Sequence, residues 1–301
     1  MKKHSLGAEK MLENMKKKME GYSGYLFIAP QLILMLFFII IPVVKGFQMS
    51  FYEKYGRSEV FVGLENYKFL LEDPIFRKSI YNTIFFIVAI VFLTIVFALF
   101  VSTTVFDKTS KYLSFIRTSY YLPVMVSMLV MSVIWKMLLN PSSGVVTWLL
   151  GLIGFEGVNL LGNPSTVMPV VVFVTFVGNV GQAILIYIAT MIGIPRDYFE
   201  AAELDGATRF QRIRHIIVPL VRTTTIYLVI TNVIAVLKIF VVIQQLTGGG
   251  PNNASVTMMY YVYQNAFVYN RGGVAAAIGV MMFIIALAFS IPQMRTYLKE
   301  D

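Results

Sequence analysis

Six apolar stretches, each about as long as a bilayer is thick, constrain this chain more than any other feature. They run from Tyr25 to Phe47, Ile80 to Phe106, Thr118 to Leu139, Val167 to Ile192, Thr223 to Leu246, and Gly272 to Ile291. An α-helix rises about 1.5 Å per residue, so roughly 20 apolar residues cross the hydrocarbon core of a membrane. The composition agrees, because 57% of the 301 residues are apolar, 14% are charged and the mean hydropathy is +0.72. We therefore predict an all-α, polytopic membrane protein with six transmembrane helices.

The chain divides into a short tail and one long bundle. Residues 1–24 form a basic tail that resembles the start of a signal peptide, but the apolar run behind it is too long and no small-residue cleavage site follows. No repeat or low-complexity linker divides residues 25–301, which we predict to be a single transmembrane domain. Between the first two spans, the segment NYKFLLEDP predicts a short helix lying on the bundle.

The distribution of Lys and Arg predicts the orientation. With the N-terminus inside, 16 of them fall in the tail, in the loop after Phe106, in a polar island between the fourth and fifth spans, and at the C-terminus, while six fall in the outer segments, five of them between the first two spans and none between the third and fourth. Positively charged loops stay in the cytoplasm. We expect both termini and the island to be cytoplasmic, in a multi-pass membrane protein. The net charge of +9 then reflects these loops, and no nucleic-acid partner is expected.

Several kinds of chemistry find no support in the sequence. The chain has no cysteine, and its two histidines, His4 and His215, lie far apart, so we expect no metal site and no cofactor. The phosphate-binding pattern G-x-x-x-x-G-K-S/T is absent; the glycine cluster at Gly248–Pro251 lacks the lysine and predicts a sharp turn after the fifth span. The predicted spans hold no acidic residue and no hydrolase motif, so the protein is not expected to be an enzyme.

A few polar side chains inside the spans are candidates for a solute path. Lys45 and Lys136 lie near span ends, where a lysine reaches the interface, but Lys238 lies about two-thirds of the way through the fifth span. The spans also carry the amides Asn179, Gln182, Asn232, Gln244 and Gln245. Hydrogen bonding between helices is the commoner use of such amides. We predict a translocation path that includes Lys238, Asn179, Gln182 and Gln244.

The polar island, EAAELDGATRFQRIRHIIVP, lies in the cytoplasmic loop 193–220. DYFEAAELDGA predicts a short helix, Gly206 permits a turn that a residue with a side chain would resist, and a second helix follows until Pro219 ends or kinks it. Two short helices bent about a glycine make a projection that could dock a partner. An amphipathic loop lying on anionic lipid fits the same pattern, and the residues alone do not separate the two.

The sequence resembles the binding-protein-dependent ABC importer permeases of the carbohydrate type (the maltose, glycerol-phosphate and multiple-sugar permeases). The spacing of their EAA loop is reproduced by Glu200, Ala201, Ala202, Gly206, Ile216 and Pro219, with Val218 where leucine is usual. Further similar blocks are GLENYKFLLEDPIFRKSIYNTIFF, FIRTSYYLPVMVSMLVMSVIWKMLLNPSSG, IPRDYFEAAELDGA and LTGGGPNNASVTMMYYVYQNAF. Thr147 departs from the asparagine that many relatives have after the NPSSG turn.

The resemblance implies a fold, a function and partners. The fold would be that of a type I ABC importer permease, paired with a second permease subunit, two ATP-binding subunits and an extracytoplasmic solute-binding protein. The segment that couples to the ATPase would comprise Glu200, Ala201, Ala202, Asp205, Gly206 and Ala207, while Gly248–Phe267 would face the solute-binding protein. The function expected is import of a sugar or oligosaccharide.

Two rival functions remain open at this stage. Lys238 could attract a glycerol-phosphate-like anion instead of a sugar. In a different class, an ion-gradient-driven carrier would need no ATPase at all.

Overall fold

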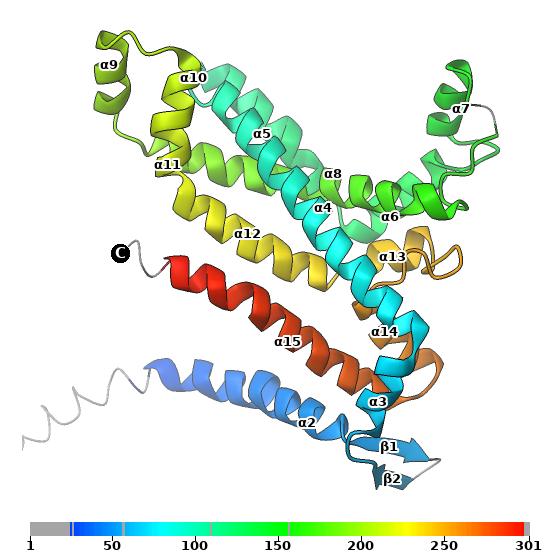
Figure 1. The fold of residues 1–301 in the computed structure, drawn as a ribbon. Coiled ribbons are helices and arrows are strands. Elements are labelled where there is room, and N and C mark those ends of the chain that lie inside the picture. Colours follow the sequence, from blue (N-terminus) through cyan, green and yellow to red (C-terminus); the bar gives the residue numbers. More distant parts are fainter. Residues whose placement is uncertain (1–24, 26, 56–57, 109, 156, 298–301) are drawn as a thin grey trace, which may run out of the picture.

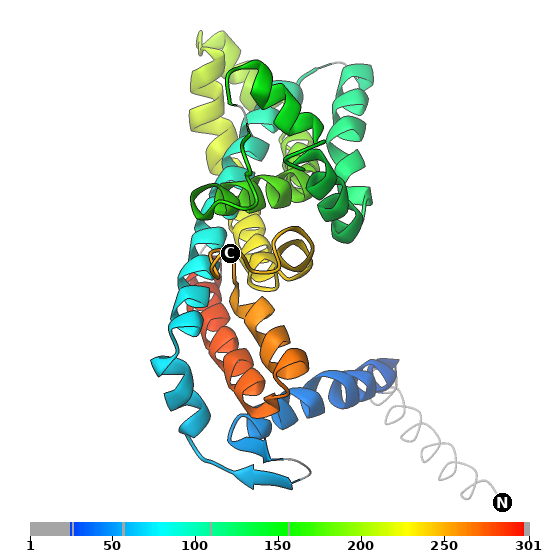
Figure 2. The same cartoon turned by 90° about the vertical axis from the view of Figure 1, so that its right-hand side faces the viewer.

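The computed structural model describes residue 25 and residues 27–55, 58–108, 110–155 and 157–297. The predicted basic tail, residues 1–24, lies outside the described residues. The described part is a set of long tilted helices with short elements gathered at both ends (Figure 1). After a quarter turn, the molecule is elongated, and its helices are stacked one above another along the long axis (Figure 2). The prediction of a helical membrane protein is confirmed.

Among the residues that the structure describes, four helices are long and apolar enough to cross a bilayer without a break. They are Phe27–Met49, which contains η1 (Leu36–Ile40) and α2 (Ile41–Met49); α4 (Pro74–Val105); α8 (Pro164–Ile192); and the Gly272–Ile291 part of α15 (Gly272–Tyr297). Both α4 and α8 start at a proline behind a capping residue. The Asp73 carboxylate accepts a hydrogen bond from the Ile75 amide at 2.9 Å, and Asn163 accepts one from Ser165 at 3.0 Å. These polar caps place the helix starts before the apolar runs predicted from hydropathy.

The two other predicted spans are not straight helices. The third consists of α5 (Ser110–Met125) and α6 (Met128–Leu138), which meet at an angle of 92°. Ser127, in an extended conformation, caps α6 by accepting a hydrogen bond from the Val130 amide at 3.3 Å. The fifth predicted span stops early, because α12 (Arg222–Leu237) ends before Lys238 and α13 (Val241–Leu246) is a separate helix. The prediction of one continuous helix over Thr118–Leu139 and another over Thr223–Leu246 is therefore wrong.

One end of the bundle carries the loop between the first two spans. As predicted, NYKFLLEDP forms a helix, α3 (Glu65–Glu72), but the hairpin β1 (Tyr52–Tyr55) and β2 (Ser58–Phe61) was not predicted. Asn66 fixes this loop by donating hydrogen bonds to the backbone oxygens of Ser50 at 2.8 Å and Tyr52 at 3.0 Å.

The same end carries α7 (Val145–Leu152), α13, α14 (Met258–Tyr263) and η3 (Gln264–Val268). The predicted glycine turn is confirmed. Gly248 and Gly249 have φ values of +57° and +82°, a left-handed backbone conformation that residues other than glycine rarely adopt. The Tyr261 hydroxyl of α14 donates to the Asp73 carboxylate at the start of α4. Burial, together with this hydrogen bond, raises the pKa of Tyr261 above its ordinary value.

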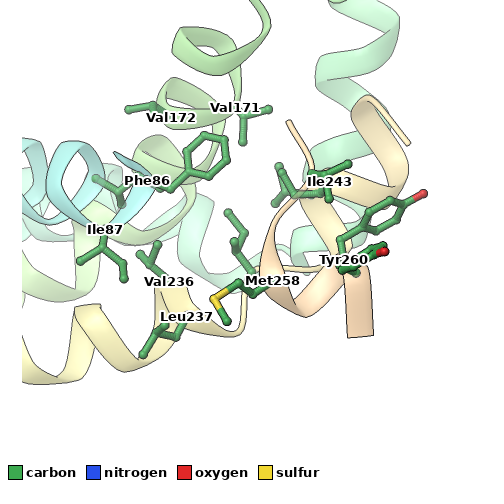
Figure 3. Close-up of a cluster of buried hydrophobic side chains, with 14 of the residues drawn as sticks. Phe86, Ile87, Val171, Val172, Val236, Leu237, Ile243, Met258 and Tyr260 are labelled. Atoms are coloured by element: carbon green, nitrogen blue, oxygen red, sulfur yellow. The ribbon is translucent and has the colours of Figure 1, made fainter. Parts of the chain in front are cut away.

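Two clusters of buried side chains hold the bundle together. The first joins residues of five helices: Phe86, Ile87, Val171, Val172, Val236, Leu237, Ile243, Met258 and Tyr260 (Figure 3). The second lies toward the opposite end and includes Ile184, Tyr187 and Ile188 of α8, together with Ile217 of the loop 193–220 and Val221 directly after it. That loop is therefore packed onto the bundle rather than extended into solution.

Candidate functional site

The polar island forms a bent pair of helices, here called the elbow (residues 197–220). It comprises α9 (Asp197–Leu204), a turn at Gly206, and a second helix made of α10 (Arg209–Arg212), η2 (Ile213–Ile217) and α11 (Val218–Leu220). The elbow lies at the end of the bundle opposite α7 and α13 (Figure 1). The predicted order of two short helices about a glycine is confirmed.

The bend of the elbow follows from local sequence. Gly206 has a φ of +72°; its amide donates to the Glu203 oxygen at 3.0 Å, and the Ala207 amide donates to the Ala202 oxygen at 2.9 Å. This pair of hydrogen bonds ends a helix at a left-handed residue, a position that favours glycine.

The second helix of the elbow has its own start signal. Thr208 and Gln211 cap each other: the Gln211 side chain accepts from the Thr208 amide at 2.7 Å, and the Thr208 hydroxyl accepts from the Gln211 amide at 3.4 Å. At the other end, the chain bends by 64° between Leu220 and Arg222, directly after Pro219. The predicted kink at this proline is confirmed.

Arg209 ties the elbow to the end of α4. Its guanidinium donates hydrogen bonds to the backbone oxygens of Thr103 and Thr104, each at 3.1 Å, and lies 3.5 Å from the Asp107 carboxylate. The last carbonyl groups of a helix lack partners within the helix and carry partial negative charge, so a cation is favoured there. Arg209 thereby joins the second helix of the elbow to the end of α4.

A hollow of about 440 Å³ lies between the two arms of the elbow and the end of α4. An ion pair between Arg212 and Glu203 connects the two arms, and the rings of Phe106 and Phe199 pack at 5.7 Å. Glu200 also lines the hollow and is exposed, and among the described residues no hydrogen bond or ion pair of its side chain is found. Its carboxylate is available to a partner.

The predicted coupling residues gather on the elbow. Glu200, Ala201, Asp205 and Gly206 are exposed, while Ala202 and Ala207 are half-buried. Sequence reasoning missed Leu204, whose side chain is 90% exposed at the tip of α9. A large apolar side chain held in solvent favours a protein surface that buries it. The signal was present in the sequence as an apolar residue directly before the turn.

A second candidate site is an open cavity of about 200 Å³ formed by α4, α8, α12 and the two helix breaks, with Lys238 exposed at its edge. Its polar lining consists of Thr175, Asn179, Asn232 and Lys238. Lys238 follows the last residue of α12, in the break before α13.

The two amides of this cavity are oriented by their own helices. The Asn179 amide nitrogen donates to the Thr175 oxygen at 2.7 Å, and the Asn232 nitrogen donates to the Leu228 oxygen at 2.8 Å. Each amide thereby uses a donor within its helix and keeps its side-chain oxygen as an acceptor. With the Lys238 ammonium as a donor, the cavity offers the mixed groups that bind hydroxyls.

The structure brings together only part of the predicted path. Asn179 and Lys238 line the cavity, whereas Gln182 and Gln244 are not among its lining residues. Asn232, which sequence reasoning did not place on the path, is a lining residue. In the part of the chain that the structure describes, no group of three or more His, Cys, Asp or Glu side chains could hold a metal ion.

Comparison with known proteins places this architecture in a family. Residues 110–294 match the family described as "Binding-protein-dependent transport system inner membrane component". Similar curated proteins include the probable ABC transporter permease protein YurN of Bacillus subtilis (strain 168), 33% identical over 278 residues that cover 91% of this chain and 95% of the relative. The trehalose/maltose transport system permease protein MalF of Thermococcus litoralis is 31% identical over 287 residues, which cover 94% of this chain and 95% of the relative.

The fold is shared with a solved transporter. A chain of the bacterial alginate ABC transporter, crystallised in complex with an alginate pentasaccharide-bound periplasmic protein, superposes with a TM-score of 0.82 at 24% identity, covering 92% of this chain and 94% of that one. The present chain belongs to the binding-protein-dependent transport system inner membrane components and has the fold of an ABC importer permease. It is a multi-pass membrane protein of a family of transport permeases.

Proposed function

We propose that this chain is the membrane-spanning permease subunit of an ABC importer for a sugar or oligosaccharide. It moves its solute without changing it chemically. The MalF relative is named for trehalose/maltose transport, and the resolved fold relative is an alginate transporter. The cavity supports the same class of cargo, because amide oxygens and an ammonium group match the hydroxyls of a carbohydrate.

The elbow is the element that carries this proposal. It would seat in a cleft of a separate ATP-binding subunit, with Leu204 buried in the cleft and Glu200 facing a basic residue of that subunit. Arg209 would pass the movement to α4, which also lines the cavity through Ile90. Two ATP-binding subunits, a second permease subunit and an extracytoplasmic solute-binding protein would complete the importer.

The topology follows from the same arrangement. The protein would reside in the bacterial inner membrane with the elbow and both termini in the cytoplasm. Residues 25–301 would form the transmembrane domain, and residues 1–24 a basic cytoplasmic tail.

A test compares two glycines that share a left-handed backbone but lie at opposite ends of the bundle. Gly206 has a φ of +72° and Gly154 a φ of +91°, and a Cβ at either position would meet open space. Proline fixes φ near −65°, so Gly206→Pro and Gly154→Pro impose the same kind of backbone conflict. Uptake into cells should fall at least tenfold for Gly206→Pro and stay near the wild-type rate for Gly154→Pro. Unchanged uptake by Gly206→Pro, with a normal amount of protein in the membrane, would refute the coupling role.

The relatives named for sugar transport do not favour the two rival functions, and each rival has its own test. If the cargo is an anion, Lys238→Met should abolish its uptake. If the uptake rate of every anionic candidate stays unchanged, Lys238 no longer supports an anionic cargo. For an ion-gradient-driven carrier, the purified chain without any ATPase should accumulate solute in liposomes under a sodium or proton gradient. Such accumulation would favour the carrier over the importer.

A further inference from the structure

The helix α7 turns its apolar face away from the protein. Its exposed side chains are Val145, Trp148, Leu149 and Leu152, which are 56%, 63%, 50% and 65% exposed. Their spacing of i, i+3, i+4 and i+7 places them on one face of the helix. Ile153 and Phe155, 69% and 59% exposed, extend this face beyond the helix. This surface, Val145–Phe155, is here called the outward face.

The opposite side of α7 is the one that packs on the protein. Thr147 is buried, and Val146 and Leu150 are half-buried, where α7 meets α6. The only polar side chain within the helix therefore points inward, and the outward side is wholly apolar. In a helix covered by water the arrangement would be reversed, so something apolar covers the outward face.

The charge pattern favours lipid over a protein partner. Between Lys136 and Arg196 the sequence holds a single charged residue, Glu156, so the loop around α7 offers no arginine or lysine for the polar rim of a protein interface. Trp148 lies at the centre of the outward face, and tryptophan is enriched where acyl chains meet headgroups.

The position of α7 also fits a membrane surface. The chain enters its loop from α6, which ends at Leu138, and leaves it through α8, which begins at Pro164. Both are parts of candidate membrane spans. α7 stands off from the bundle and runs crosswise to α8, at the end away from the elbow (Figure 1). A helix that crosses the direction of the spans beside their ends lies along the bilayer surface.

We propose that α7 is an interfacial anchor whose outward face is buried among the lipid acyl chains just below the headgroups, on the side of the membrane opposite the elbow. This anchor holds the loop that joins α6 to α8, and both helices contribute to the cavity through Met128, Thr175 and Asn179. The inference rests on the chain being a membrane permease and is independent of its cargo, so a wrong cargo leaves it intact.

The two tryptophans of the chain make a direct test possible. The full complex is reconstituted in nanodiscs of phosphatidylcholine brominated at acyl carbons 6 and 7, or at carbons 11 and 12. The emission of Trp148 is obtained by subtracting the emission of the Trp135→Phe, Trp148→Phe double variant from that of the Trp135→Phe protein. The subtraction also removes the emission of tryptophans in other subunits. Trp135 packs against Phe173, so phenylalanine keeps the aromatic contact.

We expect bromine at carbons 6 and 7 to quench the Trp148 emission by about half or more, and bromine at carbons 11 and 12 to quench it less. Emission that is quenched by aqueous iodide and untouched by either lipid would show that the face lies in water. Emission protected from both quenchers would show that a protein covers it. Either result overturns the proposal.

A second measurement avoids changing tryptophan. Because the chain has no cysteine, a nitroxide label can be attached at Leu149→Cys on the outward face or at Ser142→Cys, an exposed polar site just before α7. The label at position 149 should be more accessible to oxygen than to a water-soluble nickel complex, and the label at position 142 should show the opposite order. The same order at both positions would contradict the anchor.

Discussion

The unbroken helices and the interrupted spans contribute differently to this protein. α4 and α8 run without a break for 32 and 29 residues and pack against each other. The spans containing α5–α6 and α12–α13 are interrupted, and both interruptions lie at the cavity: Met128 follows the first, and Lys238, Ile239 and Phe240 form the second. Non-helical backbone at membrane depth is tolerated where it lines a cavity or is buried in protein. The comparison teaches that the straight helices form a frame, and that the breaks open a site beside it into which the frame helix α8 contributes Thr175 and Asn179.

The largest effect is expected from disturbing the frame. A Cβ on Gly181 of α8 would lie 1.9 Å from the Tyr120 carbonyl oxygen of α5, whereas a Cβ on Gly279 of α15 would meet nothing within 4 Å. We expect Gly181→Ala to lower the free energy of unfolding by about 3 kcal/mol, since overpacking typically costs 1–3 kcal/mol or occasionally more. Gly279→Ala is the matched control and should be neutral or slightly stabilising.

Thermal melting of the detergent-purified protein measures both variants. A Gly181→Ala protein that melts at or above the wild-type temperature would show that α5 and α8 are not held at this contact, and the distinction between frame and site would lose its basis.

The next effect concerns the site itself. Asn179 and Gln182 are amides on the same helix, but only Asn179 lines the cavity. Asn179→Leu should reduce uptake about tenfold, because losing a hydrogen bond to cargo and adding an apolar surface cost roughly 1–2 kcal/mol. Gln182→Leu should change uptake by less than twofold. Equal losses for both variants would mean that the cavity is not the path.

A smaller effect is expected where the elbow meets the frame. Arg209→Gln removes the cation that binds the end of α4, while Arg214→Gln alters an exposed arginine of the same helix. The Arg209 side chain is 46% exposed. Because solvent screens its charge, we expect its contacts with α4 to contribute only about 1 kcal/mol. We expect uptake to fall about threefold for Arg209→Gln while ATP hydrolysis by the complex continues, and Arg214→Gln to have little effect. A proportional fall in both activities would argue for lost assembly instead of lost coupling.

The two helices of the elbow, the turn at Gly206 and the kink at Pro219 could be predicted because each signal lies within a few residues of the structure it determines. The cap formed by Thr208 and Gln211 is equally local but was not predicted. Local propensity and capping act over such distances whatever the rest of the chain does.

The cavity could be predicted only in part because it depends on tertiary packing. Hydropathy identifies an apolar run but carries no information on its direction, so the 92° bend after Met125 and the break at Lys238 went unseen. Which amide faces the cavity depends on how helices rotate against each other. Asn232, a lining residue of the cavity, was not placed on the predicted path, whereas Gln182 and Gln244, which were, are not among the lining residues. The hairpin Tyr52–Phe61 was too short to give a periodic signal.

The most direct measurement uses a single cysteine at Asn179 in a chain that has none of its own. The assembled importer, in membrane vesicles, is treated with a membrane-impermeant thiol reagent from the elbow side or from the opposite side, with and without ATP and vanadate. If the breaks enclose an alternating path, the Asn179→Cys thiol reacts from one side without ATP and from the other side in the trapped state. A cysteine at Phe92, an exposed side chain on α4, should react from neither side. Reactivity of Asn179→Cys from the same side in both states, or from neither, would contradict the proposed path.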